Sequence, residues 1–438
     1  MKSKELKNIP TLRFSEFLND GEWEEKELRN LITYFKGFAF QSKDYTSNGR
    51  RIVRVSDMGF DYIKDETNAI YIDEQKANEF EKWKLQKNDL VITTVGSKPP
   101  VYDSLVGRTI IVETKDEDSL LNQNAVCIRA NKIEQVFLNV LFKRSEYVSF
   151  IESIIRGNAN QGSIALEDLF KYMCFIPSST EEQQKIANCL SSIDNLITAQ
   201  SKKVETLKEH KKGLMQQLFP TDGEEIPKLR FPEFENAPKW EKKKLGDIGN
   251  VLQGYGFPEK LQGKTEGRYP FYKVSDISNA VQSGNNFIYL SNNYIDEDVL
   301  TDLKAKTIPS GVTIFAKIGE AIRSNRRAIT TQECLVDNNV SGIKAIAGKA
   351  TDLYIFYTMS KIDLIEYCGG VVPSINKTAL ENIQIFCPPT TIEQQKIADC
   401  LSSIDELITA QSKKVETLKE HKKGLMQKLF PSNDEVSK

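Results

Sequence analysis

A chain of 438 residues is long enough for two or three domains with hydrophobic cores. Its formal net charge of −2 differs from that of a generally basic nucleic-acid-binding protein, so contacts with nucleic acid would need local basic patches or a partner subunit. No apolar run approaches the roughly 18 residues of a membrane span, and residues 1–10 lack the apolar core of a signal peptide. We therefore expect a cytoplasmic protein.

Two short segments with nearly the same residue order introduce the two halves of the chain. The first reads Ile-Pro-Thr-Leu-Arg-Phe-Ser-Glu-Phe at residues 9–17 and is followed by Trp23. The second reads Ile-Pro-Lys-Leu-Arg-Phe-Pro-Glu-Phe at residues 226–234 and is followed by Trp240. We call each segment a leader, and their recurrence indicates that the chain is built from two related halves.

Each leader precedes a module in which short apolar runs alternate with turns. In the first module, residues 25–178, the runs predict strands at 52–55, 90–95, 109–112 and 125–129, with a helical stretch near 136–155. In the second module, residues 242–389, they predict strands at 271–274, 313–318, 327–330 and 340–345, with a helical stretch near 352–367. This mixture predicts an α+β fold. The modules share a Gly-aromatic-x-Phe step and a Val-Ser-Asp step but little else, so they are expected to present two different binding surfaces.

The segment that ends each half predicts a long helix. Residues 182–220 return 211 positions later as residues 393–431, with 36 of 39 residues identical. Aliphatic residues recur at steps of four and three, which is the heptad pattern of helices that pair. Candidate N-terminal caps are Ser179 or Thr180 in the first copy and Thr391 in the second. The predicted pairing residues are Ile186, Leu190, Ile193, Ile197, Val204, Leu207, Leu214, Leu218, Ile397, Leu401, Ile404, Ile408, Val415, Leu418, Leu425 and Leu429.

The duplication also predicts how the two helices pair. A two-fold axis between the halves would bring the helices together antiparallel, with their identical seams buried against each other and the modules carried to opposite ends. Gln200, Lys211, Gln411 and Lys422 interrupt the seam. We interpret them as positions that set the register, or as exposed ends, in preference to a functional site.

The sequence contains no recognisable catalytic or cofactor-binding motif. The step Gly263-Lys264-Thr265 resembles the end of a phosphate-binding loop, but Pro258 stands where that loop needs a glycine. There is no Asn-Pro-Pro-aromatic or Asp-Pro-Pro-aromatic step of an amino-methyltransferase. The seven cysteines form no Cys-x-x-Cys pair, and the only histidines lie in the helix repeat among lysines. We therefore predict no metal site in this chain.

The order of these parts resembles the DNA-specificity subunit of type I restriction-modification enzymes. The resemblance rests on the leaders, on the duplication, and on a Pro-x-x-x-x-Glu-Gln-Gln-Lys-Ile-Ala motif at residues 177–187 and 388–398. It covers essentially the whole chain. In the second module, residues 372–376 and Leu380 also resemble the family's approach to the helix, whereas the first module departs from that pattern at residues 161–165.

The resemblance implies an architecture of two target-recognition domains separated by two long helices, which form an antiparallel coiled coil with an internal pseudo-two-fold duplication. The implied divisions are a first recognition domain at 1–178, a spacer helix at 179–220, a second recognition domain at 221–389, and a second spacer helix with a tail at 390–438. It implies a non-catalytic subunit that recognises a bipartite site in double-stranded DNA. Two methyltransferase subunits would methylate adenine N6 with S-adenosylmethionine, and motor-nuclease subunits would cleave unmodified DNA using ATP and Mg²⁺.

Contact with duplex DNA requires cations for the phosphates, and amides or guanidinium groups for the base edges. The strongest candidate is a short loop between two predicted strands that carries three arginines at residues 323–327. The full set of candidates is Lys36, Gln41, Ser42, Lys43, Arg50, Arg51, Arg54, Lys98, Arg108, Gln253, Lys260, Lys273, Lys317, Arg323, Asn325, Arg326 and Arg327.

Two other functions compete with DNA recognition. A stand-alone nuclease or methyltransferase would need a metal or cofactor motif, which the sequence does not contain. A DNA-free coiled-coil scaffold would use the duplicated helices to join proteins, and its modules would have no affinity for nucleic acid.

Overall fold

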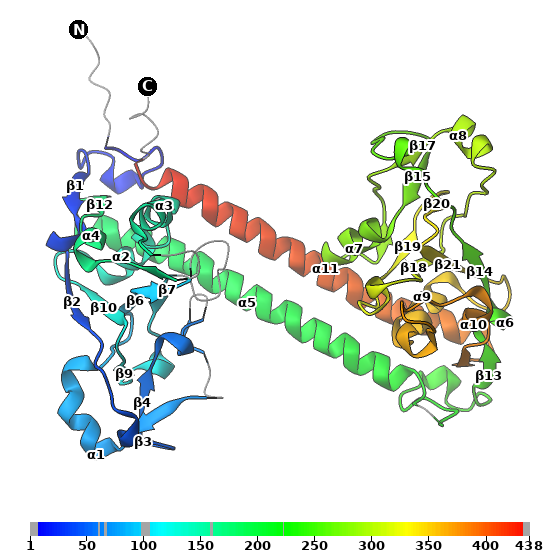
Figure 1. Cartoon of the computed structure of the whole chain (residues 1–438), viewed down its shortest axis with the longest axis horizontal. Coiled ribbons are helices and arrows are strands. Elements are labelled where there is room, and N and C mark those ends of the chain that lie inside the picture. Colours follow the sequence, from blue (N-terminus) through cyan, green and yellow to red (C-terminus); the bar gives the residue numbers. More distant parts are fainter. Residues whose placement is uncertain are drawn as a thin grey trace, which may run out of the picture. The chain divides into compact units, whose positions relative to one another are not determined.

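The computed structural model describes residues 8–59, 62–64, 68–97, 106–157, 161–221 and 223–431. The chain forms two compact units (Figure 1). One unit comprises the residues up to Ile197 together with those from Leu418 onward, and the other comprises Thr198–Thr417. Each unit therefore contains one module and one part of each long helix.

Two four-stranded sheets frame the first module. One is antiparallel with the order β2–β10–β6–β8, and the other has the order β3–β5–β4–β9 with a parallel last pair. The strands are β1 (Glu24–Glu27), β2 (Ile32–Lys36), β3 (Tyr45–Thr46), β4 (Arg50–Val53), β5 (Ile70–Ile72), β6 (Leu90–Thr93), β7 (Val95–Gly96), β8 (Thr109–Ile111), β9 (Leu120–Leu121), β10 (Ala125–Ala130), β11 (Gly162–Ser163) and β12 (Met173–Ile176). The helices are α1 (Glu74–Ala77), α2 (Gln135–Leu141), α3 (Ser145–Ile154) and α4 (Leu166–Leu169).

The core of the first unit combines its module with residues that directly follow the second long helix. Trp23 packs edge-on against Phe137 and Phe430, with ring centroids 6.1 and 5.6 Å away. Phe137 and Phe430 stack on each other at 5.6 Å. The guanidinium group of Arg144 covers the Phe430 ring at 4.5 Å. A residue near the end of the described chain therefore completes a core that begins with Trp23.

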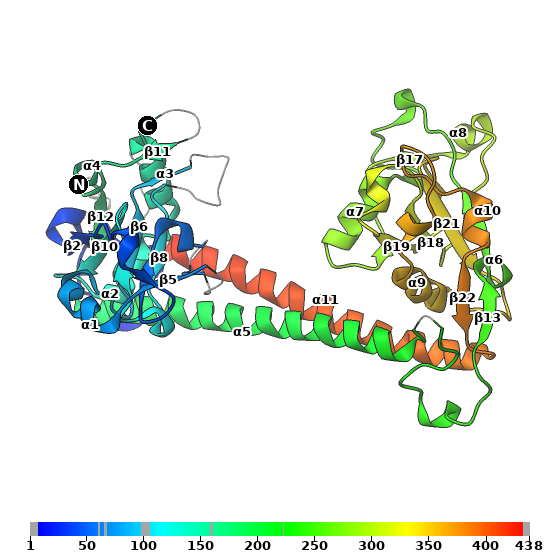
Figure 2. The same ribbon diagram turned by 60° about the horizontal axis from the view of Figure 1, so that its bottom comes forward.

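A five-stranded sheet of order β14–β21–β18–β19–β16 frames the second module, and a three-stranded sheet β17–β15–β20 adjoins it. Helix α9 packs on the larger sheet beside β18, β19 and β21 (Figure 2). The strands are β13 (Glu241–Lys244), β14 (Gly249–Gln253), β15 (Tyr269–Tyr272), β16 (Phe287–Ile288), β17 (Tyr294–Ile295), β18 (Thr313–Ala316), β19 (Arg327–Thr330), β20 (Leu335–Val336), β21 (Val340–Ala345) and β22 (Gln384–Cys387). The helices are α6 (Leu245–Ile248), α7 (Val274–Gln282), α8 (Glu297–Asp302), α9 (Asp352–Lys361) and α10 (Lys377–Glu381).

The shared Gly-aromatic step has the same structural cause in both modules. A Cβ atom on Gly37 would lie 1.8 Å from the carbonyl oxygen of Asn122, and one on Gly254 would lie 1.9 Å from that of Asp337. Only glycine permits this close approach of two backbone segments. The step is therefore a folding requirement in each module.

The long helices are α5 (Thr180–Leu218) and α11 (Thr391–Lys428). Ser179 caps α5, because its hydroxyl oxygen accepts a hydrogen bond from the Glu182 amide at 3.1 Å. In α11 the cap is Thr390, whose hydroxyl oxygen accepts from the Glu393 amide at 3.3 Å. The prediction of Thr391 as the second cap was wrong by one residue, since Thr391 already lies inside the helix.

Within each unit the two helices run antiparallel and are joined by an ion pair. Lys211 of α5 lies 2.5 Å from Asp405 of α11 in the second unit, and Lys422 of α11 lies 2.6 Å from Asp194 of α5 in the first. These pairs are repeat equivalents. The lysines that interrupt the predicted seam thus have partners on the facing helix, which agrees with a role in setting the register.

None of the predicted seam residues is exposed, but their partners differ along the helices. Ile186, Leu190 and Leu429 belong to the core of the first unit, whereas Leu218, Ile397 and Leu401 belong to that of the second. The expectation that the seams bury only each other is therefore incomplete, because the helix ends also close the module cores. The predicted α+β fold with two long antiparallel helices is confirmed.

Candidate nucleic-acid interface

A buried ion pair fastens the first leader to α5. The Nε and Nη2 atoms of Arg13 each lie 2.7 Å from a carboxylate oxygen of Glu182, in a bidentate arrangement. The side chains are only 4% and 1% exposed. Arg13 also donates to the carbonyl oxygen of Gly21 at 2.7 Å. The leader arginine and the first glutamate of the exit motif are therefore two parts of one contact, which we call the clasp.

The second half repeats the clasp with one addition. Arg230 donates to the two carboxylate oxygens of Glu393 at 2.7 and 2.8 Å, and both side chains are buried. Trp240 Nε1 donates to Glu393 at 3.1 Å, whereas the equivalent Trp23 Nε1 has no hydrogen-bond partner within the described chain. The sequence repeat could have pointed to this contact, because the same arginine recurs in both leaders and the same glutamate recurs in both exit motifs. Sequence reasoning did not identify that partner.

Each leader also bonds to the end of a long helix. The amide of Leu12 donates to the carbonyl oxygen of Lys428 at the end of α11, and the amide of Leu229 donates to that of Gln217 at the end of α5, both at 2.9 Å. These carbonyl groups have no partner further along their own helix. Each leader thus provides a hydrogen-bond donor for the last turn of one long helix, while its clasp binds the first turn of the other long helix.

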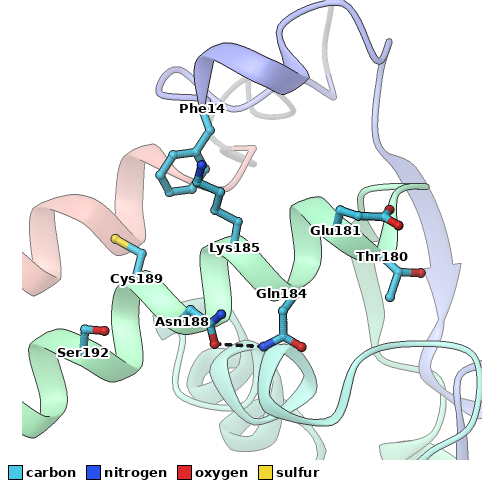
Figure 3. Close-up of a pocket in the computed structure, with 8 residues that line it drawn as sticks. All are labelled: Phe14, Thr180, Glu181, Gln184, Lys185, Asn188, Cys189 and Ser192. Carbon is cyan, nitrogen blue, oxygen red and sulfur yellow. Dashed lines mark hydrogen bonds between the residues drawn. The ribbon is translucent and has the colours of Figure 1, made fainter.

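A groove of 650 Å³ runs beside the first leader, between Phe14 and the first turns of α5 (Figure 3). Lys185 rises from α5 toward Phe14, with its amine 5.2 Å from the ring centre, and it also pairs with Glu16. Lys396 repeats both contacts in the second unit, 5.8 Å from the centre of Phe231 and 3.1 Å from Glu233. The outer face of each helix start is therefore built alike.

Four candidate DNA contacts of the first module lie at the surface. Lys36 ends β2, and Gln41, Ser42 and Lys43 lie in the turn that follows; all four side chains are exposed. The turn follows an aromatic cluster in which the ring centres of Phe38 and Phe40 lie 5.0 Å apart. These residues are accessible to a ligand, and contact with DNA stays a prediction for them.

Other basic candidates of the first module already have partners within the protein. Arg50 pairs with Glu74, Arg51 lies 3.1 Å from Asp116, and Arg54 lies 2.8 Å from Asp57. The glutamate raises the pKa of Arg50, and Asp57 raises that of Arg54. These arginines brace β4 and its turn, and a phosphate would have to compete with their carboxylates.

Of the two remaining candidates in the first module, the structure describes only Arg108. Arg108 is half-buried and donates to the carbonyl oxygen of Gly59 at 3.1 Å. Lys98 lies outside the described residues.

In the second module, two candidate lysines bind glutamines instead of carboxylates. Lys317 donates to Gln253 Oε1 at 2.6 Å, and Lys273 donates to Gln262 Oε1 at 2.8 Å. Burial lowers the pKa of Lys317. Lys260 is exposed. Within the described residues, neither amine therefore has a directly bonded carboxylate.

The arginine loop of the second module separates into surface and interior residues. Arg323 is 58% exposed and pairs with Glu320 at 2.9 Å, and Arg326 is half-exposed. Asn325 adopts a left-handed backbone with φ of 51°, and its amide donates to the carbonyl oxygen of Ile362 at 3.1 Å.

The prediction of three guanidinium groups at the surface was wrong for Arg327. It is 4% exposed, because it is the first residue of β19 and its side chain turns inward. Its guanidinium donates to the carbonyl oxygens of Asn325 and Ile362, both at 2.7 Å. Burial lowers the pKa of Arg327 to about 10, so the group remains charged at neutral pH. Arg327 holds the loop in place and does not present its charge at the surface.

The described residues show no sign of metal or membrane chemistry. In that part of the chain, no group of three or more His, Cys, Asp or Glu side chains is arranged to hold a metal ion. No described helix is both long and apolar enough to cross a membrane.

Both halves of the chain match one family model, described as the type I restriction modification DNA specificity domain, at residues 20–209 and 238–420. The chain belongs to this family. Its two matched regions each begin near the leader tryptophan and end within a long helix, so the family's repeated unit contains both a module and its helix. The clasp residues Glu182 and Glu393 lie inside the matched regions.

Individual relatives extend the match over nearly the whole chain. A proposed MjaX specificity subunit of a type I restriction enzyme from Methanocaldococcus jannaschii is 28% identical over 424 residues, which cover 93% of each chain. The EcoAI specificity subunit of Escherichia coli is 26% identical over 200 residues, covering 45% of this chain and 32% of that protein. A crystal structure of the S subunit of a type I restriction-modification system from M. genitalium superimposes with a TM-score of 0.62 and 15% identity, covering 97% of this chain and 99% of that one. That likeness supports the fold.

Proposed function

We propose that this chain is the specificity subunit of a type I restriction-modification complex and recognises a two-part site in double-stranded DNA. The observation that carries the proposal is the double family match: each half matches the specificity-domain model, while the two modules differ in sequence. Equivalent scaffolds with different modules suit a ligand whose two parts have different base sequences. The proposed cations that face the DNA are the exposed Lys36, Lys43, Lys260 and Arg323 and the half-exposed Arg326.

The repeated helices suggest that the chain binds two copies of one partner. Packing explains why the buried seam is identical in both copies, but it does not explain identity at exposed positions. Leu196 and its repeat equivalent Leu407 are 52% and 51% exposed. We assign these matching outer faces to two methyltransferase subunits, one for each half.

The catalytic steps are assigned to the partners. In this proposal the methyltransferase subunits bind S-adenosylmethionine and methylate adenine N6, and motor-nuclease subunits use ATP and Mg²⁺ to cleave unmodified DNA. This chain contributes base recognition and placement of the partners. It would then be non-catalytic, in agreement with the absence of cofactor motifs from its sequence.

The test is reconstitution with the methyltransferase subunit from the same host. We expect the pure chain alone to neither methylate nor cleave DNA, and the reconstituted complex to methylate adenines in one bipartite sequence. The motif should disappear from the host genome when this chain is deleted and return when it is supplied. Turnover by the pure chain alone would identify a stand-alone enzyme. If the methyltransferase subunits bind and methylate the same DNA when this chain is left out, the chain is a DNA-free scaffold.

A further inference from the structure

Helices α2 and α9 occupy equivalent places in the two units, but α9 carries a tyrosine that α2 lacks. Phe137 of α2 stacks on Phe430 at 5.6 Å, and Tyr354 of α9 stacks on Phe219 at 5.8 Å. Phe430 and Phe219 each lie just beyond the end of a long helix. The residues three positions further along the two module helices are Val140 and Tyr357.

In the second unit, the phenol group of Tyr357 fastens the module to α11. Its hydroxyl donates to Asp405 at 2.8 Å, and the amine of Lys211 lies 5.4 Å from its ring centre. Ser402 and Glu406 also lie close enough to influence the pKa of Tyr357, which burial and the Asp405 carboxylate raise. The hydroxyl therefore stays protonated and remains a hydrogen-bond donor.

A cavity of about 200 Å³ lies at the equivalent place in the first unit. Val140 lines this cavity, and its side chain is too short to fill the space that a tyrosine fills in the second unit. Apolar side chains such as Met426 complete the wall. The repeat equivalents of the four neighbours of Tyr357 all line the cavity, and they are Ser191, Asp194, Asn195 and Lys422.

The carboxylate in this cavity has room for a further hydrogen-bond donor. Asp194 Oδ1 lies 2.6 Å from the amine of Lys422, but Oδ2 lies 3.9 Å from that of Lys143, which is too far for a hydrogen bond. Asp405, in contrast, accepts from a hydroxyl and an amide in addition to its lysine. The side chains of Lys143 and Asp194 are 35% and 39% exposed, so the cavity is open to solvent beside them.

The size and the chemistry of the cavity match a phenol group. Engineered apolar cavities of about 150 Å³ bind benzene, so the volume is sufficient for an aromatic ring. The apolar wall suits the ring, and Asp194 suits a hydroxyl that donates. Lys422 holds the position from which Lys211 approaches the Tyr357 ring in the second unit. An anion fits less well, because the Asp194 carboxylate faces the same space.

We propose that this cavity binds a phenol group from outside the chain, whose hydroxyl donates to Asp194 and whose ring packs on Val140. Two sources supply that chemistry, a tyrosine side chain of a partner subunit and a small free phenol. Either would add the bond between module and long helix that Tyr357 supplies in the second unit. The site does not depend on the proposed recognition of DNA.

The probe is p-cresol, which reproduces the tyrosine side chain, and it is titrated into the full chain with isotope-labelled methionine methyl groups. Met426 lines the cavity, whereas its repeat equivalent Met215 packs in the second unit. We expect the Met426 signal to shift with a Kd of about 1 mM or lower, and the Met215 signal to stay unchanged. The methyl ether of p-cresol cannot donate a hydrogen bond and should bind at least about tenfold more weakly.

Two variants add the same side chain at different places. Val140→Tyr puts a phenol into the cavity and should abolish the Met426 shift. Val148→Tyr adds it at a position of α3 that is 46% exposed, and should leave binding unchanged. The proposal is overturned if Met426 does not respond to p-cresol, if the ether binds equally well, or if folded Val140→Tyr binds like the wild type. The comparison of the two ligands on the wild type decides by itself where a variant does not fold.

A further titration identifies the source of the phenol. It repeats the measurement with the methyltransferase subunit from the same host bound to the chain. A partner that inserts a tyrosine should keep p-cresol away from Met426. A Met426 signal that still responds in the complex would identify a small free phenol as the ligand.

Discussion

Arg323 and Arg327 lie four residues apart, yet their surroundings give them different physical roles. Arg323 exposes most of its side chain and has one carboxylate partner at the surface. Arg327 is buried and donates to two backbone carbonyl groups, so removing it would leave the Asn325 carbonyl oxygen without this donor, while that of Ile362 would keep only the bond from the Asn325 side chain. Only the first of these arginines is suited to contact a phosphate.

The surface pair Arg323 and Arg326 should therefore contribute to DNA affinity. We expect Arg323→Ala with Arg326→Ala to weaken binding and to lower the slope of log affinity against log salt by about 1 for each phosphate that is no longer bound. Lys202→Ala with Lys203→Ala removes the same charge from an exposed part of α5 and is the control. Titration at several salt concentrations measures both variants. Equal slopes for the two would show that the arginine pair does not bind phosphate.

The clasp of the second half allows the contribution of a buried ion pair to stability to be measured. Glu393→Gln removes the charge that Arg230 neutralises in a site where both side chains are almost inaccessible, and should lower the free energy of unfolding of the second unit by about 3–5 kcal/mol. Glu406→Gln, at an exposed position of the same helix and in the same unit, should change it by less than about 0.5 kcal/mol. Chemical denaturation measures both. Replacing Arg230→Met together with Glu393→Met should cost less than the sum of the single changes, and simple additivity would contradict a direct pairing.

At the scale of single elements, the repeat-equivalent residues Asp194 and Asp405 have unequal surroundings. Both carboxylates pair with a lysine of the facing helix. Asp405 also accepts hydrogen bonds from Asn286 at 2.7 Å and from Tyr357 at 2.8 Å. In the second unit the module is thereby bonded directly to the middle of α11. In the first unit a lysine of the module, Lys143, lies 3.9 Å from Asp194.

This difference predicts unequal effects of the same substitution. Asp405→Ala leaves three donors without their acceptor and should destabilise the second unit by about 2–4 kcal/mol. Asp194→Ala should cost the first unit only about 1 kcal/mol, because the Asp194 side chain is 39% exposed whereas that of Asp405 is 17% exposed. Hydrogen exchange should also quicken near Asn286 in the first variant. Similar costs at both sites would mean that the extra bonds to Asp405 contribute little.

The long helices and several strands were predictable because they follow local rules. The heptad repeat of 182–220 depends on residue order alone, and strands such as β19 and β21 have the predicted bounds. The helical stretch predicted at 136–155 proved to be two helices, α2 and α3, separated at residues 142–144. Which side chains face inward was less predictable. The inward turn of Arg327 depends on carbonyl groups at Asn325 and Ile362, and the latter is 35 residues away in sequence.

The candidate site shows the same limit. Cations can be found in a sequence, but their partners cannot, and the carboxylates that bind Arg50, Arg51 and Arg54 lie up to 65 residues away. The exposure of Val371 and Val372 was not predictable for the opposite reason, since two valines in a sequence resemble a core segment. Only the exposure of Val371 and Val372 in the folded chain separates them from the many buried valines.

At the scale of the whole molecule, two dissimilar modules on one repeated scaffold predict separable specificities. Replacing residues 25–178 with the equivalent module of a relative should change one half of the methylated sequence and leave the other half intact. The clasp and the seam lie in segments that the replacement retains, so the new module should find the same supports. Genome-wide methylation mapping measures the outcome. A change in both halves together would contradict independent recognition by each module.

The packing of Phe430 against Trp23 and Phe137 has a consequence for biosynthesis. The residues of the second unit form one uninterrupted stretch, whereas the core of the first unit needs residues that a ribosome adds only after that stretch is finished. The usual order, in which the N-terminal domain is completed first during translation, is therefore reversed. Until α11 has emerged, the nascent first unit leaves Trp23 and its neighbours without their last partners. A message interrupted late in its reading frame would then yield a product whose earliest-made unit is the incomplete one.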